Sequence, residues 1–212
     1  MRPTLAAFLA SLVLASDASA APATFGANLL KNPSAETPSE GAAVPGWSGP
    51  PTVFDADDYG HQSGEWDWGL SGCAACGKRY FRLQFEGEQD QQPAAEQTVD
   101  LSGAAADIDA GKVRARISGE LGGYRDSDTT AWVEAVFEDG AGRVLATLKT
   151  VPFDPAALPA PERGSTSLTP LQAQGPVPAG TRKARFRFVA KATGASGSYL
   201  GLSDDLALVL TK

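Results

Sequence analysis

The clearest pattern along the chain is a short alternation of apolar and polar residues that recurs between clusters of Gly, Pro and Asp. In residues 80–85, for example, Phe81, Leu83 and Phe85 fall on one side of an extended chain. A period of two indicates β-strands with one buried face, whereas almost no segment has the spacing of a helix. The same pattern predicts further strands at 51–55, 96–101, 113–117, 131–137, 144–148, 165–172, 183–190 and 203–210.

Short strands at this spacing predict an all-β fold, a two-sheet antiparallel β-sandwich. The first apolar segment, residues 28–36, and the last, residues 203–210, are expected to pair, because such a fold commonly brings its termini together. That pairing would place Glu36 and Asp204 within reach of one cation. Residues 119–124 are expected to bend the chain, and Trp47 to plug the sandwich.

The N-terminus has the features of a secretory signal peptide. Arg2 precedes a short apolar run that ends in Ala18-Ser-Ala20, which predicts a signal peptide over residues 1–20 and a single mature domain over 21–212. No second apolar run is long enough to span a membrane. We therefore expect a secreted or periplasmic protein without a membrane span, and a monomer.

The net charge of −7 comes without a cluster of Lys or Arg. Because nucleic-acid phosphates require concentrated positive charge, this balance argues against a nucleic-acid partner.

Two cysteines stand close together, at Cys73 and Cys76. In an exported chain such thiols are oxidised unless they are protected, which favours a local disulfide that pins a loop. A redox motif would require Cys73 at the start of a helix, and a closed zinc site would require four ligands where His61 is the only histidine.

Several segments in order carry a resemblance to a known family. They are Asn28-Leu-Leu-Lys-Asn-Pro-Ser-Ala-Glu36, Pro45-Gly-Trp47, Val99-Asp-Leu-Ser102, Ser118-Gly-Glu-Leu-Gly-Gly-Tyr124, Val177-Pro-Ala-Gly-Thr181 and Ser203-Asp-Asp-Leu-Ala-Leu208. Together they resemble the galactose-binding-domain-like jelly rolls, more narrowly exported bacterial modules related to carbohydrate-binding modules and the F-box-associated sugar-binding fold. The resemblance covers nearly all of the mature chain and rests on the order of the motifs.

The resemblance implies a jelly roll without catalytic machinery, so we do not expect an enzyme. It also implies a structural calcium between the first and last strands. By position, Glu36 matches the early acidic ligand, Asp204 matches the acid before the final strand, and Asp205 is adjacent. Backbone carbonyls would supply the remaining oxygens. The alternative is that these acids only cap turns.

The segment between Tyr59 and Tyr80 departs from those relatives. Trp66 and Trp68 on a pinned loop can present flat faces to sugar rings, with Tyr59 beside them and Asp57 and Asp58 bonding hydroxyls. The alternative is that the two tryptophans are buried as a plug over the end of the sandwich.

Four outward-facing arginines, Arg114, Arg116, Arg185 and Arg187, would form one basic stripe if their strands were neighbours. Such a stripe could hold an acidic polysaccharide, but cross-strand pairing with Glu134 and Glu138 is the favoured interpretation.

Two functions remain open on these observations. The first is an exported, non-catalytic module that binds carbohydrate and holds a structural calcium. The second is an extracellular structural or adhesion domain whose partner is another surface component rather than a sugar. Exposure of Trp66, Trp68 and Tyr59 would favour the first.

Overall fold

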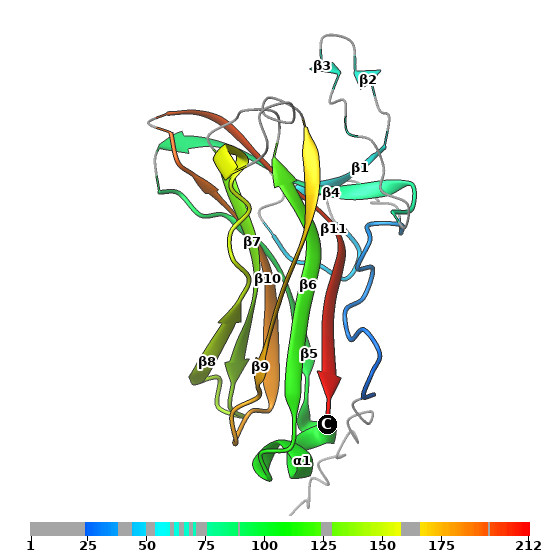
Figure 1. Cartoon of the computed structure of the whole chain (residues 1–212), viewed down its shortest axis with the longest axis vertical. Helices are drawn as coiled ribbons and strands as arrows, with labels where there is room; N and C mark the ends of the chain where they lie inside the picture. Colours follow the sequence, from blue (N-terminus) through cyan, green and yellow to red (C-terminus); the bar gives the residue numbers. More distant parts are fainter. Residues whose placement is uncertain are drawn as a thin grey trace, which may run out of the picture.

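The protein is a sandwich of two antiparallel sheets (Figure 1). The computed structural model describes residues 24–37, 44–49, 54–59, 62–63, 66–67, 70, 76–88, 90–123, 129–157, 166–194 and 196–212. The predicted all-β, two-sheet antiparallel fold is confirmed. The predicted signal peptide, His61, Trp68 and Cys73 lie outside the described residues.

The larger sheet has five strands in the order β1-β4-β11-β6-β9. Their bounds are Phe54–Asp58 (β1), Arg79–Glu88 (β4), Ser196–Thr211 (β11), Arg114–Gly123 (β6) and Ser167–Pro176 (β9). Every neighbouring pair runs antiparallel. The last strand of the chain is therefore the centre of this sheet.

The smaller sheet has four strands in the order β5-β10-β7-β8. Their bounds are Ala94–Asp100 (β5), Lys183–Ala192 (β10), Thr129–Glu138 (β7) and Val144–Lys149 (β8). Outside both sheets lie the paired strands Gln62–Ser63 (β2) and Trp66–Asp67 (β3), the 3-10 turns Ser102–Ala104 (η1) and Pro155–Ala157 (η2), and the helix Ala105–Asp109 (α1). No helix in these ranges is long and apolar enough to cross a membrane.

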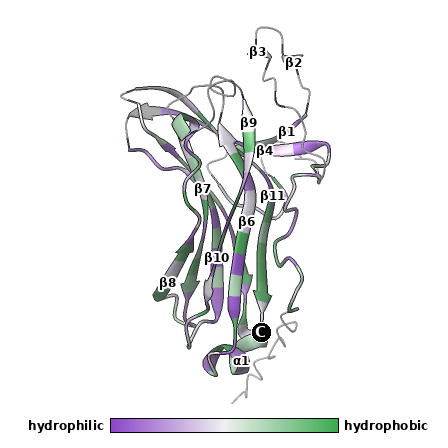
Figure 2. Ribbon diagram, viewed as in Figure 1, coloured by the Kyte–Doolittle hydropathy of each residue, from purple (hydrophilic) through white to green (hydrophobic). Residues whose placement is uncertain are grey.

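The core fills the space between the two sheets. Phe81, Leu83 and Phe85 of β4 are buried there, as the alternation predicts. Figure 2 shows the alternation along β6 as bands of opposite hydropathy. Trp47 plugs the core as predicted, with its ring centroid 5.3 Å from that of Phe81 and 6.0 Å from that of Phe186.

The first described segment runs antiparallel to the last strand, as predicted (Figure 1). The Leu29 N–H donates to the Leu208 carbonyl at 2.9 Å. The Asn28 amide donates to the Leu206 carbonyl and accepts from the Leu208 N–H. Because the pairing is a single bridge followed by turns, the segment is not a strand, but it does bring Glu36 toward the middle of β11.

The expectation that residues 119–124 bend the chain is wrong. Strand β6 continues through Gly123 and stays paired with both β11 and β9. The glycines allow close packing instead of a turn: a Cβ on Gly122 would lie 1.8 Å from the backbone oxygen of Ser167 on β9.

The four arginines do not form one stripe, because Arg114 and Arg116 lie on β6 while Arg185 and Arg187 lie on β10 of the other sheet. The favoured alternative is confirmed for β10. Arg185 pairs with Glu138 and Arg187 pairs with Glu134, and both arginines also approach Glu96 of β5.

Candidate functional site

A bulge in β11 organises the candidate site on the outer face of the five-stranded sheet. The pairing of β11 with β6 shifts between Asp204 and Ala207, and Asp205 takes a φ of +47°. A bulge inserts an extra residue and re-aims the side chains around it. Here Leu206 points into the core, whereas Asp204 points outward. Its pairing partner on β6, Glu120, lies on the same outward side.

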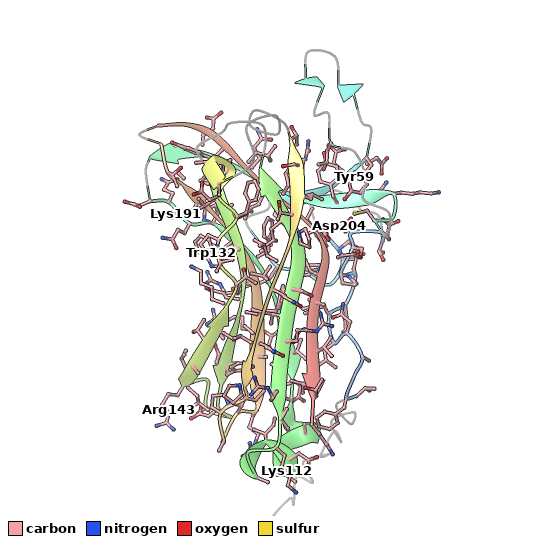
Figure 3. The ribbon with its side chains drawn as sticks, in the orientation of Figure 1. Tyr59, Lys112, Trp132, Arg143, Lys191 and Asp204 are labelled. Atoms are coloured by element: carbon pink, nitrogen blue, oxygen red, sulfur yellow. The ribbon has the colours of Figure 1, made fainter. Side chains whose placement is uncertain are left out.

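Asp204 is completely buried and held by two donors. The Tyr59 hydroxyl donates to Oδ2 at 2.7 Å, and the Asp205 N–H donates to Oδ1 at 2.7 Å. Figure 3 shows Tyr59 and Asp204 close together beside β11. Burial raises the pKa of the Asp204 carboxyl to about 7, with a further increase from the charges of Asp205 and Glu36, although both hydrogen bonds oppose it.

The same environment also perturbs Tyr59. Burial, and then the hydrogen bond to Asp204, raise the pKa of its phenol. Its ring packs 5.0 Å from that of Tyr80. The half-buried Tyr59 therefore serves as a hydrogen-bond donor to the site more than as an exposed platform.

A second apolar cluster lies beside the pair, on the face opposite the main core. It contains Leu70, Tyr80, Leu200 and Leu202, with Tyr59 packed against it. Tyr80 and Leu202 alternate with the core residues Phe81 and Ser203, so they must face outward. Leu70 thus packs on the outer face of the sheet.

A pocket of about 470 Å³ opens next to this cluster. It is lined by Ser118, Gly119 and Glu120 of β6, Pro170, Leu171 and Gln172 of β9, and Asp205 of β11. Burial, and then the charge of Asp205, raise the pKa of Glu120. The walls combine two carboxylates, an amide and a hydroxyl with the apolar ring of Pro170, whereas the Leu171 side chain packs against the core.

The three predicted calcium ligands come close to one another without forming a ligand set. Glu36 is near enough for its charge to raise the pKa of Asp204, but its Oε1 accepts the N–H groups of Lys78 and Arg79 at 2.7 and 2.9 Å. Oδ1 of Asp205 accepts the Ser34 hydroxyl at 2.8 Å. No group of three or more acidic, His or Cys side chains in the described ranges is arranged to hold a metal. Calcium therefore stays a prediction.

The predicted sugar-binding acids are engaged with arginines. Asp57 pairs with Arg82 at 2.9 Å, and Asp58 pairs with Arg79 at 2.9 Å. These pairs tie the edge strand β1 to β4.

The other predicted loop residues are placed only in part. The backbone of Trp66 lies in β3, paired with β2 at the top of Figure 1. The Trp66 side chain and the whole of Trp68 fall outside the described part of the chain. Cys76 is half-buried just before Gly77, and its predicted bond to Cys73 stays a prediction.

The pocket residues Glu120 and Gln172 were not identified from the sequence. An outward-facing Ser118 and Glu120 follow from the alternation along β6, but nothing local shows that β9 and the β11 bulge lie on either side of them. The pairing of β6 with two distant strands creates this pocket.

Comparison with known proteins shows likeness of fold. No protein-family model and no curated protein matches the chain. A cyclase from Fischerella sp. TAU in complex with 4-(1H-indol-3-yl)butan-2-one has 14% identity and a TM-score of 0.58, over 86% of this chain and 96% of the cyclase. The enzymatically active domain of tailspike protein 4 of bacteriophage CBA120 has 13% identity and a TM-score of 0.50, over 87% of this chain and 21% of the tailspike chain.

The CBM22-1 xylan-binding domain of Paenibacillus barcinonensis Xyn10C has 17% identity and a TM-score of 0.48, over 90% of this chain and 98% of the domain. This chain spans about a fifth of the tailspike chain and nearly all of the other two. At these identities the likeness concerns the fold alone. The predicted resemblance to jelly-roll modules is therefore confirmed for the fold, which is a β-sandwich.

Proposed function

We propose that the mature chain is an exported, non-catalytic module that binds carbohydrate in the pocket between β6, β9 and the β11 bulge. The observation that carries this proposal is the pocket itself, whose volume of about 470 Å³ is in the range of small-ligand sites. Sugars present hydroxyl groups together with apolar C–H faces. The carboxylates, amide and hydroxyl of the walls can bond the hydroxyls, while the ring of Pro170 can contact a C–H face.

The position of the pocket supports binding. Its side chains project from three hydrogen-bonded strands, so their spacing is set by the sheet rather than by a loop. The buried Asp204 accepts the Asp205 N–H and the Tyr59 hydroxyl, and these two bonds hold the bulge in place. The segment with Trp66 and Trp68 leaves β1 directly after Tyr59, so we propose that these tryptophans supply the aromatic contacts.

A glycan array probed with residues 21–212 tests this function, followed by calorimetry with the best ligand. Gln172→Ala should weaken binding roughly tenfold, the effect of one lost hydrogen bond in a desolvated site. Gln174→Ala is the matched control, because Gln174 lies on the same strand and the same face but does not line the pocket. Equal losses in both variants would place the ligand elsewhere.

Two further results complete the test. Trp66→Ala or Trp68→Ala should lower affinity by about 1–3 kcal/mol with little change in stability, as expected for anchor residues. If either variant unfolds the protein and no glycan binds, the structural or adhesion function is favoured. The ligand should also be recovered intact after long incubation, since cleavage would overturn the non-catalytic assignment.

A further inference from the structure

We propose that the pocket prefers a glycan that carries a protonated amine, an amino sugar, over neutral or acidic glycans. This inference rests on the proposed function and names the ligand class for the same pocket. It follows from the charges that line the pocket and from the way carboxylates are neutralised in the rest of the molecule.

Most carboxylates in the described ranges face a cation of the protein itself. The ion pairs are Asp57–Arg82, Asp58–Arg79, Asp90–Lys191, Asp107–Lys212, Asp109–Arg182, Glu134–Arg187, Asp139–Arg143 and Glu138–Arg185, with Glu96 near two arginines. Nine carboxylates in these ranges are thus matched with Lys or Arg side chains, whereas a minority, among them Glu86, Asp100 and Asp154, are not.

The two pocket carboxylates depart from this pattern. Within the described residues, Glu120 and Asp205 form no ion pair with Lys or Arg, and the charge of Asp205 helps to raise the pKa of Glu120. The nearest arginine along β6, Arg116, bonds the Ser118 hydroxyl at 3.3 Å rather than Glu120. Asp204 accepts hydrogen bonds from Tyr59 and the Asp205 N–H, and its pKa of about 7 leaves it mostly protonated at about pH 6. The charge at the pocket thus comes from Glu120 and Asp205 themselves. Negative charge therefore collects at one end of the pocket.

An ammonium group on a sugar matches this arrangement. It carries three donors, and carboxylates on two neighbouring strands can accept from it in charge-assisted hydrogen bonds. The pocket is also much larger than a lone metal ion, and its remaining walls, with Gln172, Ser118 and Pro170, suit the body of a sugar. An acidic glycan would be repelled by the same two carboxylates.

The test compares two ligands with the same sugar backbone, one cationic and one neutral: a glucosamine tetrasaccharide and its fully N-acetylated counterpart. Binding to residues 21–212 is measured by calorimetry at about pH 6, below the usual pKa of an amine, in a buffer that contains a metal chelator. We expect the glucosamine oligomer to bind at least tenfold more tightly. Added salt should weaken its binding, whereas binding of the neutral oligomer should change little.

Two variants connect this preference to the pocket. Glu120→Gln and Asp205→Asn should each reduce affinity for the amine roughly tenfold, the scale of a lost charge-assisted bond. Asn tolerates the positive φ at position 205, so this variant should fold. Glu86→Gln is the control for net charge. Glu86 is exposed on β4 and pairs with Ser198 of β11. Ser198 lies six residues before Asp204, so Glu86 is roughly 20 Å along the sheet from the Asp204 position.

The outcomes separate the two proposals. If both oligomers bind equally and Glu120→Gln has no effect, the ligand class is wrong while carbohydrate binding stands. If Glu86→Gln weakens binding as much as Glu120→Gln, the preference is only attraction to an acidic protein and the inference fails. The inference also fails if the array identifies a neutral or acidic glycan as the ligand and the protein does not bind glucosamine. No binding to any glycan overturns the proposed function as well.

Discussion

Replacing Asp204 by Asn should make the free energy of unfolding less dependent on pH. The variant should be less stable than the wild type at low pH and more stable than it at high pH. The Asp204 carboxyl has a pKa of about 7 in the folded chain against an ordinary value of 3.8, because the charged form is buried. A group whose pKa is raised on folding stabilises the protein fully below its unfolded pKa. This contribution is lost as the pH rises through the folded pKa, because the folded state must then hold a buried charge.

The size of the effect follows from this shift. A displacement of about three pKa units corresponds to roughly 4 kcal/mol of unfolding free energy, lost between about pH 4 and pH 7. Asn at this position does not titrate. Its side chain has one acceptor oxygen for the two hydrogen bonds that Tyr59 and the Asp205 N–H donate. The variant should therefore lose about 1 kcal/mol of unfolding free energy at low pH. The two stability curves should therefore cross near about pH 5, with Asp204→Asn more stable by roughly 3 kcal/mol at about pH 8.

Urea unfolding followed by tryptophan fluorescence measures both curves, with a chelator present so that no metal compensates the charge. The informative quantity is the difference in unfolding free energy between variant and wild type across the pH range. A difference that stays constant within about 0.5 kcal/mol would show that Asp204 does not change its protonation on folding. Tyr59→Phe is a control, since it removes the donor but keeps the carboxyl; the pKa of Asp204 should rise further, and the loss of stability should extend to higher pH than in the wild type.

Three further predictions follow from the structure. Gly122→Ala should destabilise the fold by about 3 kcal/mol or more in urea unfolding, because a methyl group would lie 1.8 Å from a backbone oxygen of β9, whereas Gly140→Ala should be nearly neutral, because its methyl group would meet only the Arg182 side chain at 3.9 Å. Calcium should raise the melting temperature of the wild type but not of Asp204→Asn; melting unchanged by calcium or chelator would exclude the metal. Intact mass after alkylation without reduction should show Cys73 and Cys76 unmodified, and two added alkyl groups would exclude their disulfide.

The period-two pattern alone determined a large part of the fold. It identified the faces of β4, β6, β7 and β10, because successive side chains of a strand point to opposite sides wherever the strand lies. The placement of Phe81, Leu83 and Phe85 in the core, and the pairing of Arg187 with Glu134, followed from it. The contact between the first segment and the last strand also followed, since a closed sandwich has to bring such ends together.

Only the tertiary structure decided where the candidate site lies. Glycines that predict a bend when read locally form a straight strand, because Gly122 allows β9 to approach closely. The bulge at Asp205 and the position of Glu120 opposite Asp204 depend on the register of strands that are distant in the sequence. A local pattern specifies the face on which a side chain lies, but it carries no information about the neighbouring strand. The pocket and its uncompensated charge arise from that pairing. The sequence therefore indicated a sandwich, whereas the long-range hydrogen bonds between β11, β6 and β9 determined where its candidate binding surface lies.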